Sequence, residues 1–168
     1  MSEVVTLRIC GFPGPDRRLG DDYTQAAFST QVSALESAQL KPFLITIGAL
    51  DTFTTAPYFS VLDIECGIAH ARQALAKPSG DGPGERGFPY VPHVTFGLYG
   101  GRFAMPNVVR HLNSAPRIEP VRVTVKQLTL MTYEASVIAG PLTSVCAFDL
   151  ESQTLRMLDH EAMESLFR

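Results

Sequence analysis

Apolar and polar residues alternate along much of this chain, and the alternation predicts most of its β-strands. The stretch at 89–100, Pro-Tyr-Val-Pro-His-Val-Thr-Phe-Gly-Leu-Tyr-Gly, shows the pattern clearly. Its apolar side chains, Val94, Phe96 and Leu98, are predicted to face the core, which leaves His93 and Thr95 together on the opposite face. Further strands are predicted at 4–10, 43–50, 58–64, 121–133 and 145–150.

A spacing of three to four residues between apolar side chains predicts the helices. Asp21 or Asp22 is predicted to cap a helix that runs to about residue 38. A second helix is predicted at 66–76, and a third begins at Pro106 with Val109 and Leu112 on one face. The tail is predicted to add a strand at 154–158 and then a short helix.

The strand at 4–10 repeats the pattern of the His93 strand. Its Val-Thr pair and closing glycine match, but Val4 occupies the position of the histidine. Each half then follows the order strand, helix, strand, strand. This predicts an α+β fold of duplicated β-α-β-β lobes with pseudo-twofold symmetry, mostly antiparallel sheets forming a central cleft, and helices outside. The two opening strands are expected to meet near the axis.

We predict a single bilobal domain over residues 1–168. Lobe one covers about 1–76, a polar loop follows at 77–88, lobe two covers about 89–151, and 152–168 form a C-terminal extension. The 168 residues suffice for one well-buried core.

Composition and charge limit the classes of molecule that this protein is expected to bind. The formal net charge of −3 disfavours bulk electrostatic binding of nucleic acid, so any RNA contact is expected to be local, at an end carrying a phosphate.

The three cysteines are odd in number and lie in apolar runs, which indicates reduced core residues of a cytoplasmic protein. The sequence has no signal peptide, no membrane-length apolar run and no metal-ligand cluster, and no cofactor is expected.

The polar side chains of the two repeats suit acid–base chemistry on a phosphate. A histidine exchanges protons near neutral pH, and a threonine two residues along a strand projects on the same face, where its hydroxyl can hold a phosphate oxygen. Thr6 and Arg8 would extend this site, while Tyr90 and Tyr99 flank it and could stack on a base. The alternative is that His93 is an ordinary strand histidine and that the repeat is purely structural.

His93-Val94-Thr95-Phe96, preceded by Tyr90-Val91-Pro92, resembles the second His-x-Thr-x (HxTx) signature of the two-histidine (2H) phosphoesterase superfamily. The most similar group is the bacterial 2′-5′ RNA ligase-like proteins, or RNA 2′,3′-cyclic phosphodiesterases. Val4-Val5-Thr6-Leu7-Arg8 aligns with the first signature, and 43–53 and 125–131 are similar to two further strands of the family.

This resemblance implies a hydrolase that cleaves a 2′,3′-cyclic phosphate or a 2′-5′ linkage in RNA or a nucleotide, without a metal. His93 and Thr95 would be its catalytic residues, and Thr6 the second threonine.

Two features depart from the family pattern. Val4 carries no titratable proton, and only residues 1–3 precede the first signature, where the family usually has a strand and a helix. The terminal segment at 154–167 could occupy the sheet edge that the missing strand would leave free.

Two functions therefore stay open: a cyclic phosphodiesterase impaired by the loss of one histidine, and a degenerate module that binds a phosphate, nucleotide or RNA end. The natural substrate, the direction of the reaction and the oligomeric state do not follow from the sequence.

Overall fold

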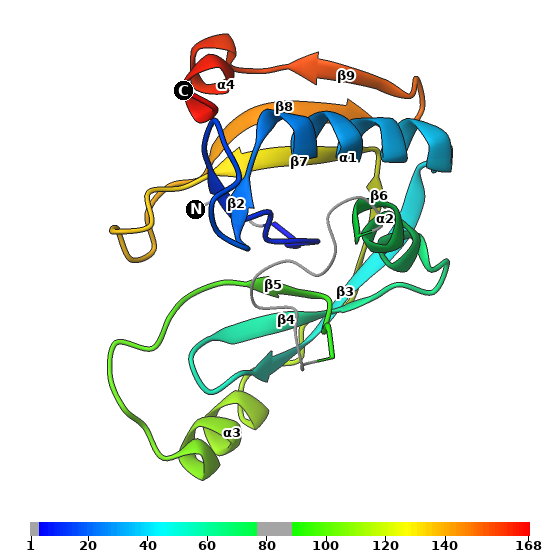
Figure 1. The fold of residues 1–168 in the computed structure, drawn as a ribbon. Helices are drawn as coiled ribbons and strands as arrows, with labels where there is room; N and C mark the ends of the chain where they lie inside the picture. Colours follow the sequence, from blue (N-terminus) through cyan, green and yellow to red (C-terminus); the bar gives the residue numbers. More distant parts are fainter. Residues whose placement is uncertain (1–3, 77–88) are drawn as a thin grey trace.

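The computed structural model describes residues 4–76 and 89–168, and two antiparallel sheets form its framework (Figure 1). The four-stranded sheet has the order β5-β4-β3-β6, and the three-stranded sheet has the order β7-β8-β9. A two-residue parallel pair, β1-β2, lies in the loop before α1. The α+β class predicted from the sequence is confirmed.

The bounds of the elements are as follows. The strands are β1 (Phe12–Pro13), β2 (Asp22–Tyr23), β3 (Phe43–Thr52), β4 (Pro57–Leu62), β5 (His93–Thr95), β6 (Val121–Val125), β7 (Gln127–Thr132), β8 (Thr143–Asp149) and β9 (Thr154–Met157). The helices are α1 (Gln25–Ala38), α2 (Gly67–Ala76), α3 (Met105–Asn113) and α4 (His160–Leu166). None of the described helices has the length and apolar character needed to cross a membrane.

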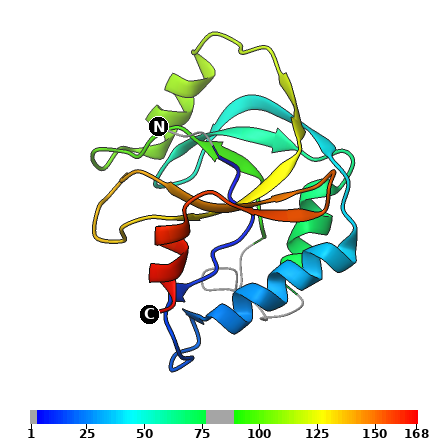
Figure 2. The same cartoon turned by 90° about the horizontal axis from the view of Figure 1, so that it is seen from above.

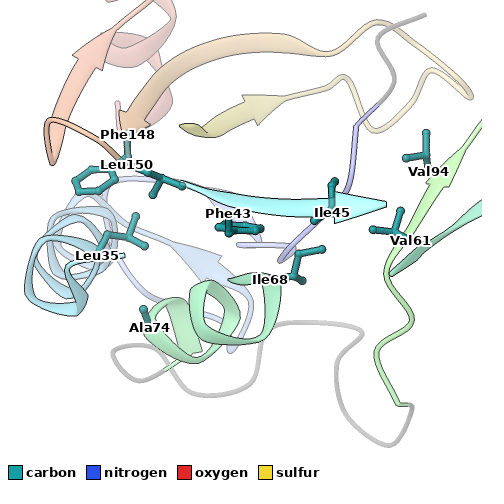
Figure 3. Packing of buried hydrophobic residues seen from close by; sticks show 9 residues of the cluster. All are labelled: Leu35, Phe43, Ile45, Val61, Ile68, Ala74, Val94, Phe148 and Leu150. Atoms are coloured by element: carbon teal, nitrogen blue, oxygen red, sulfur yellow. The ribbon is translucent and has the colours of Figure 1, made fainter. Parts of the chain in front are cut away.

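One hydrophobic cluster joins the two sheets to α1 and α2 (Figure 3). The four-stranded sheet contributes alternate residues, which share one face as the sequence predicted. The helices and β8 supply the other side of the cluster. Its buried members are Leu35, Phe43, Ile45, Val61, Ile68, Ala74, Val94, Phe148 and Leu150. The opposite face of the four-stranded sheet, which includes His93, therefore points away from this core.

Three predicted strands differ from the structure. Residues 4–10 form no regular strand; they pair with the rest of the fold through one isolated bridge, between Val5 and Val94. The strand predicted at 121–133 is two strands in different sheets, separated at Lys126. The His93 strand ends at Thr95, and beyond it Phe96 and Leu98 are 38% and 51% exposed, so the predicted apolar face does not continue.

The helices begin and pack partly as expected. Thr24, and not an aspartate, caps α1 by accepting a hydrogen bond from the backbone N–H of Ala27. The Asp22 carboxylate instead accepts hydrogen bonds from the backbone of Arg18 and Leu19 within the preceding loop. Helix α3 buries none of its residues; Val109, which was predicted to share one helical face with Leu112, is 44% exposed.

The two sheets do not coincide with the two halves of the sequence. Strands β5 and β6 follow the segment at 77–88, yet they pair with β4 and β3 and complete their sheet. That polar loop lies outside the described residues. In the view from above, the N-terminal segment passes from the side of β5 to the end of the molecule that carries α4 (Figure 2).

Candidate functional site

The bridge between Val5 and Val94 brings the two repeated segments side by side. Val94 is only 3% exposed, and Val5 packs against the same core cluster. Since neighbouring side chains of extended chains point to opposite sides, Thr6 and His93 lie on the face that points away from the core. In an antiparallel pair, the residue after Val5 lies beside the residue before Val94. The predicted meeting of the two segments is present, with Thr6 beside His93.

Exposure agrees with this placement. Thr6 and Thr95 are exposed, and His93 is half-buried. By the same register Val4, which replaces the first histidine of the repeat, lies beside Thr95. The site therefore presents one imidazole, two hydroxyls and one valine on a common face.

Side-chain contacts hold the N-terminal segment in place where a regular strand ladder is lacking. The Tyr90 hydroxyl donates a hydrogen bond to the Thr6 carbonyl oxygen over 2.9 Å, and the Arg72 guanidinium donates one to the Leu7 carbonyl oxygen. That guanidinium also lies 3.6 Å above the centre of the Tyr90 ring. Tyr90, predicted as a base-stacking residue, has one ring face covered by Arg72 and helps to position Thr6.

The His93 ring is oriented by the backbone carbonyl of Val91 and by two aromatic neighbours. Its Nδ1 lies 2.7 Å from the Val91 carbonyl oxygen. A carbonyl oxygen can only accept, so Nδ1 carries the hydrogen and Nε2 of the neutral ring keeps the free lone pair. The rings of Phe53 and Tyr58 meet the imidazole edge to face, with centroid distances of 4.8 and 5.4 Å. Nε2 is thus the nitrogen that can accept a proton from a substrate or water.

A second layer of contacts fixes these aromatic rings. Phe53 and Tyr58 stack at 4.2 Å, and the Tyr58 hydroxyl donates a hydrogen bond of 3.1 Å to the Asp51 carboxylate. Burial raises the pKa of Tyr58, and the hydrogen bond to Asp51 adds to this, so the phenol stays protonated. None of these three residues, Asp51, Phe53 and Tyr58, was predicted from the sequence to belong to the site. Tyr58 contacts His93 because of the register between β4 and β5, in which Tyr58 pairs with Thr95, and no sequence pattern encodes that register.

Arg8 does not share the exposed position of Thr6. Its side chain is half-buried, with an inaccessible Nε, and its positive charge acts on the buried Tyr23 hydroxyl, which donates a 2.6 Å hydrogen bond to Gln31. The structure therefore places Arg8 toward the inside of the fold, near α1.

Tyr99 contacts the turn between β3 and β4. Its hydroxyl lies 2.6 Å from the Thr52 hydroxyl, and its backbone N–H donates to the Thr55 carbonyl oxygen over 3.2 Å. Its ring meets Phe103 edge to face at 6.0 Å. Tyr99 thus anchors the chain that leads from His93 to α3.

The rest of the described chain was searched for metal sites and for grooves away from His93. Residues 4–76 and 89–168 contain no group of three or more His, Cys, Asp or Glu side chains arranged to hold a metal ion. An open groove between α1 and α2, lined in part by His70 and Gln73, lies on different elements from the His93 face. His70 itself is exposed, as predicted.

Comparison with known proteins identifies a family. The sequence model of a protein family described as the 2′-5′ RNA ligase superfamily matches residues 5–136, which is most of the chain and includes Thr6, His93 and Thr95. A search of curated protein sequences finds no match.

Proposed function

The chain belongs to the 2′-5′ RNA ligase superfamily, and from this we propose that it cleaves a 2′,3′-cyclic phosphate or a 2′-5′ phosphodiester in RNA or a nucleotide by metal-free acid–base chemistry. The observation that carries the proposal is the position of the His93 imidazole. Its Nδ1 is engaged by Val91, its Nε2 keeps a lone pair, and the exposed Thr6 and Thr95 lie on the same face.

Each residue has a distinct role in this reaction. His93 Nε2 takes a proton from the attacking water as the oxygen bonds to phosphorus. The hydroxyls of Thr6 and Thr95 donate hydrogen bonds to the non-bridging oxygens, where negative charge increases in the transition state. The bond from phosphorus to the ribose oxygen breaks, and that oxygen gains a proton.

Val4 limits the rate. A histidine at this position would protonate the leaving oxygen, but valine cannot, so water must supply the proton. Loss of one general acid costs about 10²- to 10⁴-fold in rate. The proposed enzyme is therefore slow.

Hydrolysis of a nucleoside 2′,3′-cyclic phosphate, followed by chromatography of the nucleoside monophosphate, tests the proposal. Replacing His93 by Gln should lower turnover about 100-fold or more because the general base is lost. The matched control is His70→Gln, which changes an exposed histidine on α2 and should leave turnover unchanged. Absence of turnover in the wild-type protein, or equal turnover in His93→Gln, contradicts the enzymatic proposal.

Because Val4 cannot donate a proton, it also favours a second candidate function, a module that binds a phosphorylated nucleotide or RNA end without cleaving it. The two threonines and His93 would hold the phosphate, and the missing proton donor would be of no consequence. This candidate predicts calorimetric binding of a nucleoside 2′,3′-cyclic phosphate, weakened by Thr6→Val, with no product formed. Undetectable binding excludes it.

A further inference from the structure

Ser60 of β4 lies directly beside His93 of β5. The two residues are partners in the antiparallel ladder that joins these strands, which run side by side in the four-stranded sheet (Figure 1). Directly opposed residues of such a pair point to the same face, with Cβ atoms about 4.5–5.5 Å apart. Thr6 lies on the other side of His93, through the bridge at Val5. The imidazole therefore stands between two hydroxyl groups.

The Ser60 hydroxyl lies over an irregularity in β3. The pairing of β3 with β4 shifts register between Ile47 and Leu50, opposite Ser60, and bulges of this kind are common next to active sites. A Cβ at Gly48 would lie 3.1 Å from Ser60 Oγ, so the glycine leaves room for the hydroxyl. Within residues 4–76 and 89–168 no hydrogen bond engages that hydroxyl, which can therefore bind a ligand.

The sheet face beside Ser60 is accessible to solvent. Ser60 is half-buried, and Leu62, two positions along β4 on the same face, is 56% exposed. In the other direction along β4, the Tyr58 ring contacts the imidazole of His93, so the imidazole is in contact with the β4 side of the site. Water thus reaches the space between His93 and Ser60.

The geometry of the proposed reaction fixes the side from which water attacks. The bridge at Val5 places four side chains together in a square. Val4 and His93 occupy one pair of opposite corners, and Thr6 and Thr95 occupy the other pair. The attacking and leaving oxygens lie roughly in line across phosphorus. With the leaving oxygen at the corner of residue 4, the water is at the corner of His93, and the next side chain beyond it is Ser60.

We propose that Ser60 holds the attacking water for His93. This rests on the proposed function, because it assigns the reacting phosphate to His93 and the two threonines. The water donates one hydrogen bond to His93 Nε2 and the other to Ser60 Oγ, which directs a lone pair of its oxygen toward phosphorus.

The serine itself exchanges no proton in this step. As the bond from the water oxygen to phosphorus forms, one proton of the water passes to His93 Nε2. The bond from phosphorus to the ribose oxygen breaks, and that oxygen takes a proton from solvent water. The role of Ser60 is to orient the nucleophile.

This role predicts discrimination between water and methanol. Methanol can donate a hydrogen bond to His93 Nε2, but it has no second hydrogen for Ser60, and its methyl group would meet the serine instead. A site that binds a particular hydrogen of its ligand rejects an analogue that lacks it. Attack by water gives the nucleoside monophosphate and attack by methanol gives its methyl ester, so chromatography measures the ratio of the two products.

The test compares Ser60→Ala with the wild-type protein on a nucleoside 2′,3′-cyclic phosphate, in water and in dilute methanol. The matched control is Ser144→Ala, which removes a half-buried serine hydroxyl from β8 in the other sheet. We expect Ser60→Ala to lower kcat about three- to tenfold, the effect of one hydrogen bond, with KM nearly unchanged. The ratio of methyl ester to monophosphate should rise by a similar factor. Ser144→Ala should match the wild-type protein in both measurements.

Two results overturn the inference. An unchanged product ratio in Ser60→Ala does so even where kcat falls, because a change of packing alone slows attack by water and by methanol alike. A raised KM with normal kcat also does so, since it assigns Ser60 to substrate binding.

Two further variants separate this inference from the proposed function. Turnover that is lost in His93→Gln but unchanged in Ser60→Ala contradicts this inference alone. Val4→His provides a second background in which faster turnover is expected. If only that variant forms product, the proposed function of the native protein fails, and the effect of Ser60→Ala on the product ratio in that background decides the inference. Absence of product in both backgrounds contradicts both.

Discussion

The hydroxyl of Tyr90 donates a hydrogen bond of 2.9 Å to the backbone carbonyl oxygen of Thr6, which lies 84 positions earlier in the chain. The contact joins the segment before β5 to an N-terminal segment that otherwise meets β5 through the bridge at Val5. The position of the Thr6 hydroxyl beside His93 therefore depends on a side chain as well as on strand pairing.

Tyr90→Phe removes this hydrogen bond but keeps the ring beneath Arg72. We expect the free energy of unfolding in urea to fall by about 1 kcal/mol, as is usual for one hydrogen bond. The KM for a nucleoside 2′,3′-cyclic phosphate should rise because Thr6 is less well fixed. Tyr133→Phe, at a residue 61% exposed, is the control and should change neither quantity. An unchanged KM in Tyr90→Phe would mean that this contact does not position Thr6.

In the proposed reaction, a histidine at position 4 would supply the acid that protonates the leaving oxygen. Val4 lies beside Thr95 on the face of His93, so an imidazole there would reach the opposite side of the same phosphate. We expect Val4→His to raise kcat for the cyclic phosphate by about 10²- to 10⁴-fold. Val4→Gln, which is polar but does not titrate, should give no such gain. Equal rates in the two variants would show that residue 4 does not face the reacting phosphate.

Phe53 limits the movement of the His93 imidazole. Phe53→Leu keeps apolar volume but removes the ring that meets His93 at 4.8 Å. The expected result is a kcat lowered roughly tenfold with KM nearly unchanged, because misorientation of the base affects the transition state more than binding. Phe12→Leu, at a residue 59% exposed, is the matched control. A changed KM with normal kcat would instead assign Phe53 to substrate binding.

The arrangement of side chains on β5 could be predicted because it depends on local sequence. Alternation of side chains predicted the burial of Val94, which is 3% exposed, and the same rule placed Thr95 on the face of His93. The division at Lys126 could not be predicted, since the β-type residues continue on both sides of it while the chain passes from one sheet to the other.

The features of the site that the sequence did not predict have the same cause, namely contacts between segments far apart in the chain. Tyr58 contacts His93 through the pairing of β4 with β5, and Phe53 stacks on Tyr58. Arg8 does not continue the alternation of Val5 and Thr6, because no regular strand extends beyond the bridge at Val5. Pairing and register arise from packing between distant segments, which local periodicity does not describe.

Two tyrosines make the fold sensitive to alkaline pH. Burial raises the pKa of Tyr23 and of Tyr58 above the ordinary value of a tyrosine, about 10. Above that pH the unfolded chain releases these protons while the folded protein retains them, so stability falls as pH rises, by up to about 1.4 kcal/mol per pH unit for each tyrosine. Urea unfolding at pH values from about 9 to 11 should show this loss. Tyr23→Phe should make the fall of unfolding free energy with pH less steep, and Tyr133→Phe should not. An equal slope in both variants would contradict the assignment of this pH dependence to Tyr23.

Gly67 occupies a position where any side chain meets the core. A Cβ at this residue would fall on the ring of Phe43, well inside van der Waals contact, because the first turn of α2 packs directly against β3. Phe43 is 6% exposed and cannot move away without disturbing the central cluster. We expect Gly67→Ala to lower the free energy of unfolding in urea by about 1–3 kcal/mol, despite the better helix propensity of alanine. Gly100→Ala, where a Cβ would meet nothing within 4 Å, should be nearly neutral. A Gly67→Ala variant as stable as wild type would show that α2 does not pack this closely against Phe43.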